Sequence, residues 1–434
     1  WSTSSEPDPS PTPRHRCPDP SMPMLSTLPM SVLPLLPWRA APVEPVPRLD
    51  VRRRASARSL RVCFVGLENL PVLSRAYSRH GVGGEQVQHT LLARALARRG
   101  HEVSMVVGDY GQADAARVDG ITLHKAHRLR GGVPVLRFFH PRLTGLWSAL
   151  RRADADVYYL SCAGQQIAIA AAFARLHRRR LVFRIAHDRD CEPDALLVPH
   201  RHDRWMYGWG LRRADVVLAQ SQQQAVRLKA NYGLDSQLAA MLVDPPGQVP
   251  SFEAREVDVL WVNNLRPFKR PDRLLTLARA LPHLRFEMIG GTQSGHEAMY
   301  TQIQAEAQTL PNLRFLGPVP YHEVNGHYER ARVFVNTSDS EGFPNSYLQA
   351  WRRGTPSVAF FDPDAVIARH GLGAAVPDDD AMAAEVARLA TQREPWAAAH
   401  RRCLDFMDGH YGDDRVLPPY LEALHGHHDD GRGR

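Results

Sequence analysis

Cysteine is scarce in this chain of 434 residues, which has five, namely Cys17, Cys63, Cys162, Cys191 and Cys403. They are scattered and odd in number, and no two have the Cys-x-x-Cys spacing. This pattern argues against a disulfide framework and against a zinc site. It also favours a reducing compartment, so we expect the protein in the cytoplasm.

The chain also lacks an uninterrupted apolar run long enough to span a membrane. Met24 to Trp38 is apolar, but Pro29, Pro34 and Pro37 interrupt it, and it lacks the basic start and cleavage site of a signal peptide. The net charge of +8 is compatible with an anionic substrate, an anionic membrane surface or nucleic acid. We attribute most of this charge to the general abundance of arginine. Peripheral contact with the inner face of an anionic membrane stays open.

Two common nucleotide-binding motifs are missing. Neither half of the chain opens with the G-x-G-x-x-G dinucleotide fingerprint, and no G-x-x-x-x-G-K-[ST] phosphate loop occurs. An NAD-dependent oxidoreductase is therefore disfavoured. No motif for nucleic-acid binding is present either, so we expect no nucleic acid as a partner.

Residues 1–58 form a segment of distinct composition. Thirteen of the 34 prolines precede Arg48, with Ser and Arg between them. Such a segment cannot bury enough apolar surface to fold, and we predict that it is disordered. The tail 426–434 is predicted to be disordered as well.

From residue 59 onward, short apolar runs alternate with helical patterns in two successive blocks. The first block covers 59–245 and the second 246–395, with a proline-rich stretch from Val243 to Pro250 between them. This alternation predicts an α/β protein with two doubly wound, Rossmann-like domains, each built on a parallel sheet. Ser357 to Phe360 is the last clear strand. Helices within 396–425 are predicted to pack across the two domains.

The stretch Ser340 to Trp351 (SEGFPNSYLQAW) follows an apolar run, Arg332 to Thr337, that we interpret as a buried strand. Pro344 suits a first helical turn and Gly354 a helix stop, so we predict a strand, a loop and a helix in this order. Glu341 lies just before the helix, whose free N–H groups and dipole favour an anion. Such a corner could hold a sugar attached to a phosphate, or it could be an ordinary corner with a surface glutamate.

A second candidate is the loop Asn264 to Arg270 (NLRPFKR), which follows the predicted strand Val257 to Val262. Arg266 and Lys269 lie three residues apart, in front of a helix that begins at Pro271. Two cations beside a helix N-terminus suit a diphosphate. The arginine can donate two parallel hydrogen bonds to phosphate oxygens, and the lysine contributes a compact positive charge. The alternative is a basic loop in an arginine-rich chain, but the position at the carboxyl end of a strand favours binding.

Two weaker candidates come from the first block. Gly81 to Glu85 is glycine-rich and precedes a helix, so its backbone could approach a phosphate. His187 follows the predicted strand Leu181 to Ile185 and could act as a base, an electrophile or a hydrogen-bond donor. We interpret Asp188 and Asp190 as loop or cap residues rather than as a carboxylate pair.

Taken together, NLRPFKRPD and SEGFPNSYLQAW resemble the retaining glycosyltransferases of family 4, also called glycosyltransferase group 1, which have the two-domain GT-B fold. The resemblance extends over about Leu60 to Tyr411 and includes the segments AQSQQQAVRLKANYG, NLRFLGPVPYHEV and GTPSVAF. It implies a nucleotide-activated sugar donor bound mainly by the second domain and an acceptor held mainly by the first. It also implies that the reaction needs neither a metal nor another cofactor.

The resemblance implies roles for individual residues. Arg266 and Lys269 match residues that hold the donor diphosphate, and both would be catalytic. Glu341 matches a catalytic residue that contacts the donor sugar, and His187 matches one that approaches the reacting sugar. The remaining implied donor-binding residues are Gly83 and Gly84 from the first domain and Gly342, Phe343, Pro344, Asn345 and Gln349 from the second.

Two positions depart from the family pattern. The family usually has glutamate at position 349, where it grips the ribose hydroxyls, and this chain has Gln349. The glutamine can still accept a hydrogen bond, but a charge-assisted one is lost, a loss of about 1 kcal/mol in donor binding. Met241 to Pro246 stands where relatives usually have an Asn-Gly turn. This difference affects the geometry of the hinge between the two predicted domains.

These features predict a metal-independent, retaining hexosyltransferase that moves a sugar from a nucleotide-sugar to a glycan, glycolipid or small-molecule acceptor, for example in the cell envelope. Retention in this family needs no strong protein nucleophile, because the leaving diphosphate can accept the proton of the incoming hydroxyl. Two alternatives share the architecture. One is a sugar-nucleotide epimerase, and the other is a non-catalytic sugar-nucleotide-binding protein, which Gln349 supports.

Overall fold

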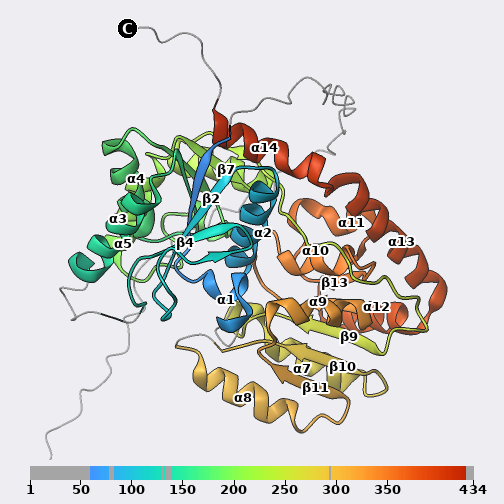
Figure 1. Cartoon of the computed structure of the whole chain (residues 1–434). Coiled ribbons are helices and arrows are strands. Elements are labelled where there is room, and N and C mark those ends of the chain that lie inside the picture. Colours follow the sequence, from blue (N-terminus) through green and yellow to red (C-terminus); the bar gives the residue numbers. More distant parts are fainter. Residues whose placement is uncertain (1–58, 78–82, 130, 132–137, 293–294, 427–434) are drawn as a thin grey trace, which may run out of the picture. The chain divides into compact units, whose positions relative to one another are not determined.

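The computed structural model describes residues 59–77, 83–129, 131, 138–292 and 295–426 (Figure 1). Every described residue belongs to one unit, Arg58–Arg434. The predictions of disorder for 1–58 and for 427–434 lie outside the described residues, and so does Gly81 of the glycine-rich loop.

Among the described residues, eight strands form a first sheet in the order β3-β4-β2-β1-β5-β6-β7-β8. All neighbouring pairs are parallel except β3 and β4. The strands are β1 (Arg61–Val65), β2 (Glu102–Val107), β3 (Arg117–Val118), β4 (Ile121–Lys125), β5 (Val157–Ser161), β6 (Arg180–Arg184), β7 (Val216–Ala219) and β8 (Gln237–Leu238).

Helices cover both faces of this sheet. Along β1, Val62 and Phe64 pack on one face while Cys63 and Val65 pack on the other, as expected for a strand buried on both sides. The first face is covered by α1 (Leu70–Leu73), α2 (Gly84–Arg98) and α14 (Asp413–His425). The second face is covered by α3 (Thr144–Ala153), α4 (Gln166–Leu176), α5 (Arg201–Leu211) and α6 (Gln222–Tyr232).

Six strands within the described ranges form a second, fully parallel sheet in the order β11-β10-β9-β12-β13-β14. They are β9 (Val257–Val262), β10 (Phe286–Ile289), β11 (Leu313–Gly317), β12 (Ala331–Asn336), β13 (Ser357–Ala359) and β14 (Gly373–Ala375). One face packs on α7 (Pro271–Ala280), α8 (Glu297–Ala307) and α12 (Asp379–Thr391). The other packs on α9 (Tyr321–Arg330), α10 (Asn345–Trp351), α11 (Val366–His370) and α13 (Arg393–His410).

The last two helices connect the two sheets. α13 packs Cys403, Phe406 and Met407 into the core of the second sheet, beside α10. α14 then places Tyr420 and Leu424 in the core of the first sheet. Figure 1 shows this return of the chain, from α13 along the second sheet to α14 above the first. No helix in the described part is long and apolar enough to cross a bilayer.

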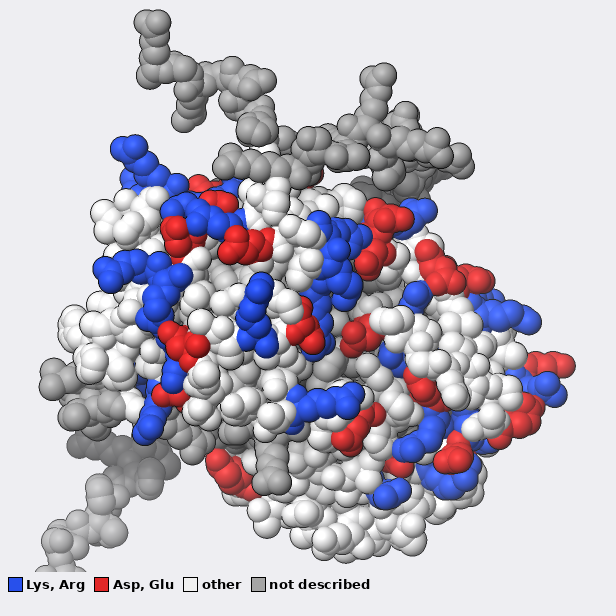
Figure 2. Space-filling view, viewed as in Figure 1, with Lys and Arg blue, Asp and Glu red and all other residues white. Residues whose placement is uncertain are grey.

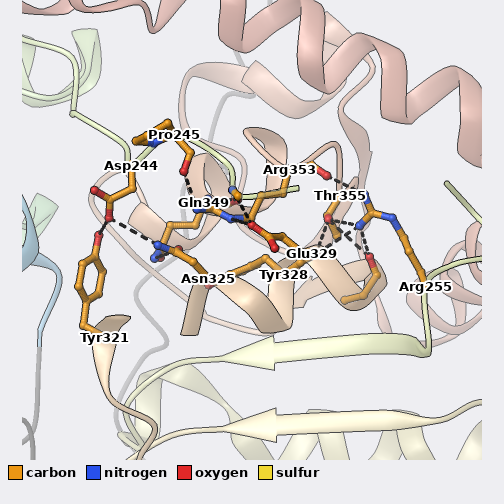
Figure 3. Close-up of polar contacts among 12 residues, drawn as sticks. Asp244, Pro245, Arg255, Tyr321, Asn325, Tyr328, Glu329, Gln349, Arg353 and Thr355 are labelled. Carbon is orange, nitrogen blue, oxygen red and sulfur yellow. Dashed lines mark hydrogen bonds and ion pairs between the residues drawn. The ribbon is translucent and has the colours of Figure 1, made fainter. Parts of the chain in front are cut away.

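Polar contacts hold the linker between the two sheets against the second one (Figure 3). The carboxylate of Asp244 accepts a hydrogen bond of 2.5 Å from the hydroxyl of Tyr321. The carbonyl of Pro245 accepts one of 3.2 Å from Arg353, whose side chain is 1% exposed. These contacts fix where the chain leaves the first sheet.

The buried side chain of Arg255 stabilises the beginning of the second domain through hydrogen bonds. Its guanidinium is buried and donates to the carbonyls of Tyr328, Ala331 and Arg353 at 3.2, 2.5 and 2.6 Å, as well as to the hydroxyl of Thr355 at 2.7 Å (Figure 3). A buried cation is tolerated when its donors are all matched by oxygen acceptors. Arg255 therefore joins α9, β12 and the end of α10.

Charges of opposite sign lie interspersed on the face shown in Figure 2. Several arginines of the described chain form ion pairs on the surface, such as Arg61 with Asp154 at 2.7 Å and Arg352 with Asp408 at 2.6 Å. Local pairing of this kind neutralises part of the net positive charge.

The structure confirms the predicted fold class of two parallel-sheet α/β domains. The prediction that Ser357 to Phe360 is the last strand is wrong, because β14 follows β13 in the second sheet. β14 was not predicted, because its three residues, Gly373 to Ala375, are small and none of them is fully buried. The sequence also gave no clear signal for α5, which has two glycines in its interior.

We expect Arg255→Met to lower the free energy of unfolding by about 3 kcal/mol or more. The methionine leaves several buried carbonyl oxygens without their donor, and each unsatisfied group costs about 1–3 kcal/mol. Denaturant unfolding followed by circular dichroism measures this change. Arg314→Met is the matched control, since its side chain is 75% exposed. Equal unfolding midpoints for the two variants would contradict the role given to Arg255.

Candidate functional site

The site is built around the loop between β12 and α10. Glu341 lies in this loop and is buried, with 6% of its surface exposed. Its Oε1 accepts a hydrogen bond of 2.7 Å from the hydroxyl of Ser338 and forms an ion pair with Nζ of Lys269. The carboxylate is therefore held at a fixed point at the carboxyl end of the second sheet, where ligands bind in doubly wound folds.

The loop after β9 is bound to the same place. A short 3-10 turn over Pro267–Lys269 lies against the end of β12, because the hydroxyl of Thr337 donates to the carbonyl of Lys269 at 2.8 Å. The N–H of Asp339 donates to the carbonyl of Phe268, also at 2.8 Å. Two loops that are 70 residues apart in sequence thus form one surface.

The ring of Phe268 lies at the centre of this surface. The guanidinium carbon of Arg266 is 5.9 Å from its centroid and Nζ of Lys269 is 5.3 Å from it. The imidazole of His187, which comes from the first sheet, approaches the same ring edge-on at 5.8 Å. The structure therefore brings together all four residues that the sequence singled out as catalytic, Arg266, Lys269, Glu341 and His187.

The contacts of His187 define its protonation state. Its Nδ1 accepts a hydrogen bond of 3.0 Å from the N–H of Arg189, and Asp190 accepts one of 3.0 Å from the N–H of His187. The pKa of His187 is lowered to about 4, mainly by burial. The charge of Glu341 opposes this shift, and those of Lys269 and Arg266 contribute to it. The ring is therefore neutral at physiological pH and carries its proton on Nε2.

The Nε2 atom of His187 is buried and has no hydrogen-bond partner among the described residues. Of the three roles considered for His187, the geometry favours that of a hydrogen-bond donor, because Nδ1 is occupied and Nε2 bears the proton. Asp188 and Asp190 are loop and cap residues, as interpreted from the sequence. Asp188 accepts from the side chain of Gln224 at 2.9 Å, and Asp190 closes a capping box.

Gly342 lets the two sheets approach each other at this loop. A side chain on Gly342 would place its Cβ 2.7 Å from the carbonyl oxygen of Ala186, which lies beside His187. The N–H of the next residue, Phe343, donates to Oε1 of Gln220 at 2.8 Å. The resemblance also implies that the N–H groups of Gly342 to Asn345 face the sugar and the phosphate of the donor. For two residues this needs correction, since the N–H of Phe343 is bound by the first sheet and Pro344 has no N–H.

The predicted glycines of the first sheet lie at the beginning of α2, where Gly83 is the N-cap. The carbonyl of Gly84 accepts a hydrogen bond of 2.7 Å from the side chain of Asn345, and Gln88 donates to Asn345 at 2.8 Å. The N-termini of α2 and α10 are thus bound to each other. Two helix N-termini side by side create a region of positive potential that suits an anion.

Gln349 lies one turn further along α10. Its Nε2 donates to Oδ1 of Asn325 at 3.1 Å, and Nδ2 of Asn325 is 3.5 Å from the carboxylate of Asp244 (Figure 3). Gln349 is therefore oriented by α9 and, through Asn325, by the linker. Sequence reasoning missed Asn325, Gln88 and Gln220, because their partners are distant in the chain. It also missed Ser338, although its partner Glu341 is only three residues away.

Among the described residues, no group of three or more His, Cys, Asp or Glu side chains is placed to hold a metal ion.

Two family models match separate parts of the chain. Residues 82–241 match the model described as Glycosyltransferase Family 4, and residues 256–392 match the model described as Glycosyl transferases group 1. The first match covers most of the first sheet with its helices, and the second covers the second sheet.

Curated relatives match shorter stretches. A D-inositol 3-phosphate glycosyltransferase of Geodermatophilus obscurus is 30% identical over 172 residues, which are 34% of this chain and 38% of the relative. A protein of the same name from Mycobacterium sp. strain KMS is 32% identical over 110 residues, 25% of each chain. The matched regions therefore span well under half the length of these relatives.

Solved structures match over most of the chain. HepE of Anabaena, crystallised with UDP and glucose, has a TM-score of 0.65 at 15% identity, covering 84% of this chain and 99% of that one. Sucrose-phosphate synthase of Thermosynechococcus elongatus has a TM-score of 0.62 at 16% identity, covering 84% and 98%. At this level of identity the likeness establishes the fold.

We expect the imidazole of His187 to stay neutral, with its proton on Nε2, from pH 8 down to about pH 5. Its pKa of about 4 lies below the unfolded value near 6.5, so the unfolded chain binds more protons between these values. The stability contribution of His187 is therefore lost as the pH falls through this window. Nitrogen-15 NMR of the histidine rings, with His187→Gln to identify the signal, measures the titration. Protonation near pH 6.5 would contradict the assignment.

Proposed function

Since this chain belongs to the group 1 glycosyltransferases, which have the GT-B fold, we propose that it transfers a sugar from a nucleotide-sugar donor with retention of configuration. The observation that carries this proposal is the convergence of Lys269, Glu341 and His187 beside two helix N-termini. The acceptor is a glycan, a glycolipid or a small molecule.

The diphosphate of the donor binds to Arg266 and Lys269 in this proposal. Both side chains flank Phe268, and the N-termini of α2 and α10 add partial positive charge nearby. In the chain without ligand, Lys269 is paired with Glu341. A bound diphosphate takes over the lysine, which frees the carboxylate of Glu341 to accept hydrogen bonds from sugar hydroxyls.

The sugar lies between Glu341 and His187. Ser338 keeps the carboxylate oriented after the lysine has moved to the phosphate, because its hydroxyl donates to the same oxygen. From the opposite side, the N–H at Nε2 of His187 has no partner among the described residues and can donate to a hydroxyl of the sugar. An acceptor on one side and a donor on the other fix the orientation of the ring.

The reaction breaks the bond between the anomeric carbon and the diphosphate oxygen and forms a bond from the anomeric carbon to the acceptor oxygen. The proton of the acceptor hydroxyl passes to the leaving diphosphate oxygen, on the same face of the sugar. Arg266, Lys269 and the helix N-termini stabilise the charge that develops on the leaving group. Since two side-chain cations fill this role, we propose that transfer needs no metal, and activity should survive chelation by EDTA.

The names of the relatives support the choice of donors to test first. HepE of Anabaena was crystallised with UDP and glucose, so UDP-glucose is the first donor to test. Two curated relatives are named as D-inositol 3-phosphate glycosyltransferases, so inositol phosphates belong in the acceptor panel. Cell-envelope glycans complete that panel.

We expect Lys269→Ala and Glu341→Ala to leave the fold intact and to lower turnover at least about a hundredfold. Loss of one charged group at a developing charge typically costs about 2.7–4 kcal/mol of transition-state stabilisation. Release of UDP from the donor in the presence of the acceptor measures turnover.

Lys229→Ala and Glu385→Ala are matched controls for these two variants. Lys229 on α6 pairs with Asp235 just beyond that helix, and its side chain is 59% exposed. Glu385 pairs with Arg388 on α12, and its side chain is 20% exposed. The controls should turn over like the wild type. Unchanged turnover in Lys269→Ala or Glu341→Ala would overturn the site.

We expect Gln349→Glu to retain donor affinity or to tighten it by about fivefold, as a charge-assisted hydrogen bond adds about 1 kcal/mol. The new carboxylate can accept a hydrogen bond from the side-chain amide of Asn325 once that amide group has flipped by half a turn. Isothermal titration with the nucleotide diphosphate measures the change, with the exposed Gln304→Glu on α8 as control. A tenfold loss of affinity would show that position 349 does not face the ribose. Binding without turnover in the wild type would instead favour a non-catalytic protein.

A further inference from the structure

A group of polar side chains lies at the carboxyl end of the first sheet, beneath the first turns of α2. We call it the Arg184 cluster, and its members are Glu85, His89, Ser161, Cys162 and Arg184. Glu85 and His89 lie one turn apart on α2, with 3.7 Å between Oε1 and Nε2. Ser161 and Arg184 are paired in register at the ends of β5 and β6.

Arg184 is buried in this cluster without a counter-charge. Arg184 is 2% exposed, and its Nε and Nη2 atoms lack a hydrogen-bond partner among the described residues. No carboxylate of the described chain lies within ion-pair distance of it. The hydroxyl of Tyr420 on α14 is a hydrogen-bond partner of its guanidinium, and it carries no negative charge. A buried guanidinium with two unmatched donors is costly in the chain alone.

The neighbours of Arg184 do not supply the missing charge. Burial raises the pKa of Glu85 to about 8, so at neutral pH this carboxyl group is mostly protonated. Burial lowers the pKa of His89 to about 3, so its ring is neutral. His89 is 1% exposed, and neither of its ring nitrogens has a hydrogen-bond partner in the described structure. The cluster therefore contains one full positive charge and several unused donors.

The cluster adjoins the proposed donor site. The thiol of Cys162 is hydrogen-bonded with Glu85, and it lies close enough to Arg266 to influence the pKa of that guanidinium. Arg266 is one of the two cations assigned to the diphosphate. Glu85 and Cys162 are also only half-buried, whereas Arg184 and His89 are enclosed. These two residues therefore form the more exposed edge of the cluster.

We propose that the Arg184 cluster binds a negatively charged group of the acceptor, a carboxylate or a phosphate ester. Arg184 provides the counter-charge, and Ser161 and His89 donate hydrogen bonds to the same group. The acceptor hydroxyl then lies toward Cys162 and the donor sugar. This inference rests on the proposed function, and it restricts the acceptor to an anionic molecule.

The test measures anion binding to the full chain by thermal shift, with UDP present at saturation to fill the donor site. Inorganic phosphate and acetate are the probes, and chloride at equal ionic strength is the reference. We expect phosphate or acetate to raise the melting temperature of the wild type, and the better of the two identifies the group that the acceptor carries. No shift with either anion would overturn the proposal.

Two variants of the cluster make the test specific. Arg184→Gln should weaken anion binding at least about tenfold, because it removes the only full positive charge. Glu85→Gln should tighten it, since it removes the residual negative charge beside Arg184. If Glu85 is instead the structural partner of Arg184, Glu85→Gln lowers the melting temperature and adds no affinity for anions. This result would overturn the proposal. It can be obtained even if Arg184→Gln does not fold.

The shift in melting temperature caused by the nucleotide alone distinguishes failure of the anion site from failure of the proposed function. An unchanged UDP shift with no anion binding contradicts the Arg184 cluster as an anion site and leaves the proposed function intact. Absence of a shift with each of UDP, GDP and ADP in the wild type contradicts the proposed function itself.

Discussion

The ion pair between Lys269 and Glu341 is the interaction on which the rest of the site depends. Both side chains are largely buried, with 14% and 8% of their surfaces exposed. A buried pair persists only if further hydrogen bonds satisfy its remaining atoms, and Ser338 supplies one of them. In the proposed function, the diphosphate of the donor replaces the carboxylate as the partner of the lysine. Until then, the ion pair keeps both charges matched in the free chain.

The fold brings these charges to one point through the geometry of parallel sheets. β9 and β12 are neighbours in the second sheet, so the loops at their carboxyl ends meet, and β6 of the first sheet delivers His187 to the same place. Close approach needs small residues at two contacts, Gly342 against Ala186 and Gly84 against Asn345. The same approach places Arg266 near Cys162, so the proposed donor site adjoins the Arg184 cluster.

Much of this arrangement could be predicted from the sequence. β9 was predicted with its exact bounds, and the four residues expected to be catalytic meet around Phe268, because motifs at strand ends reflect local geometry. Contacts between distant segments could not be predicted. The N–H of Phe343 is bound by Gln220, 123 positions earlier, and Gln349 is oriented by Asn325 on another helix. The unmatched donors of Arg184 became visible only when burial was known.

The most direct test of the central claim is a thermal-shift titration of the full chain with UDP, GDP and ADP. A nucleotide present at about a hundred times its dissociation constant should add about 2.7 kcal/mol of stability. The account predicts a clear shift with one nucleotide, retained in Lys229→Ala and lost in Lys269→Ala. No shift with any of the three, or an equal shift in Lys269→Ala, would contradict it.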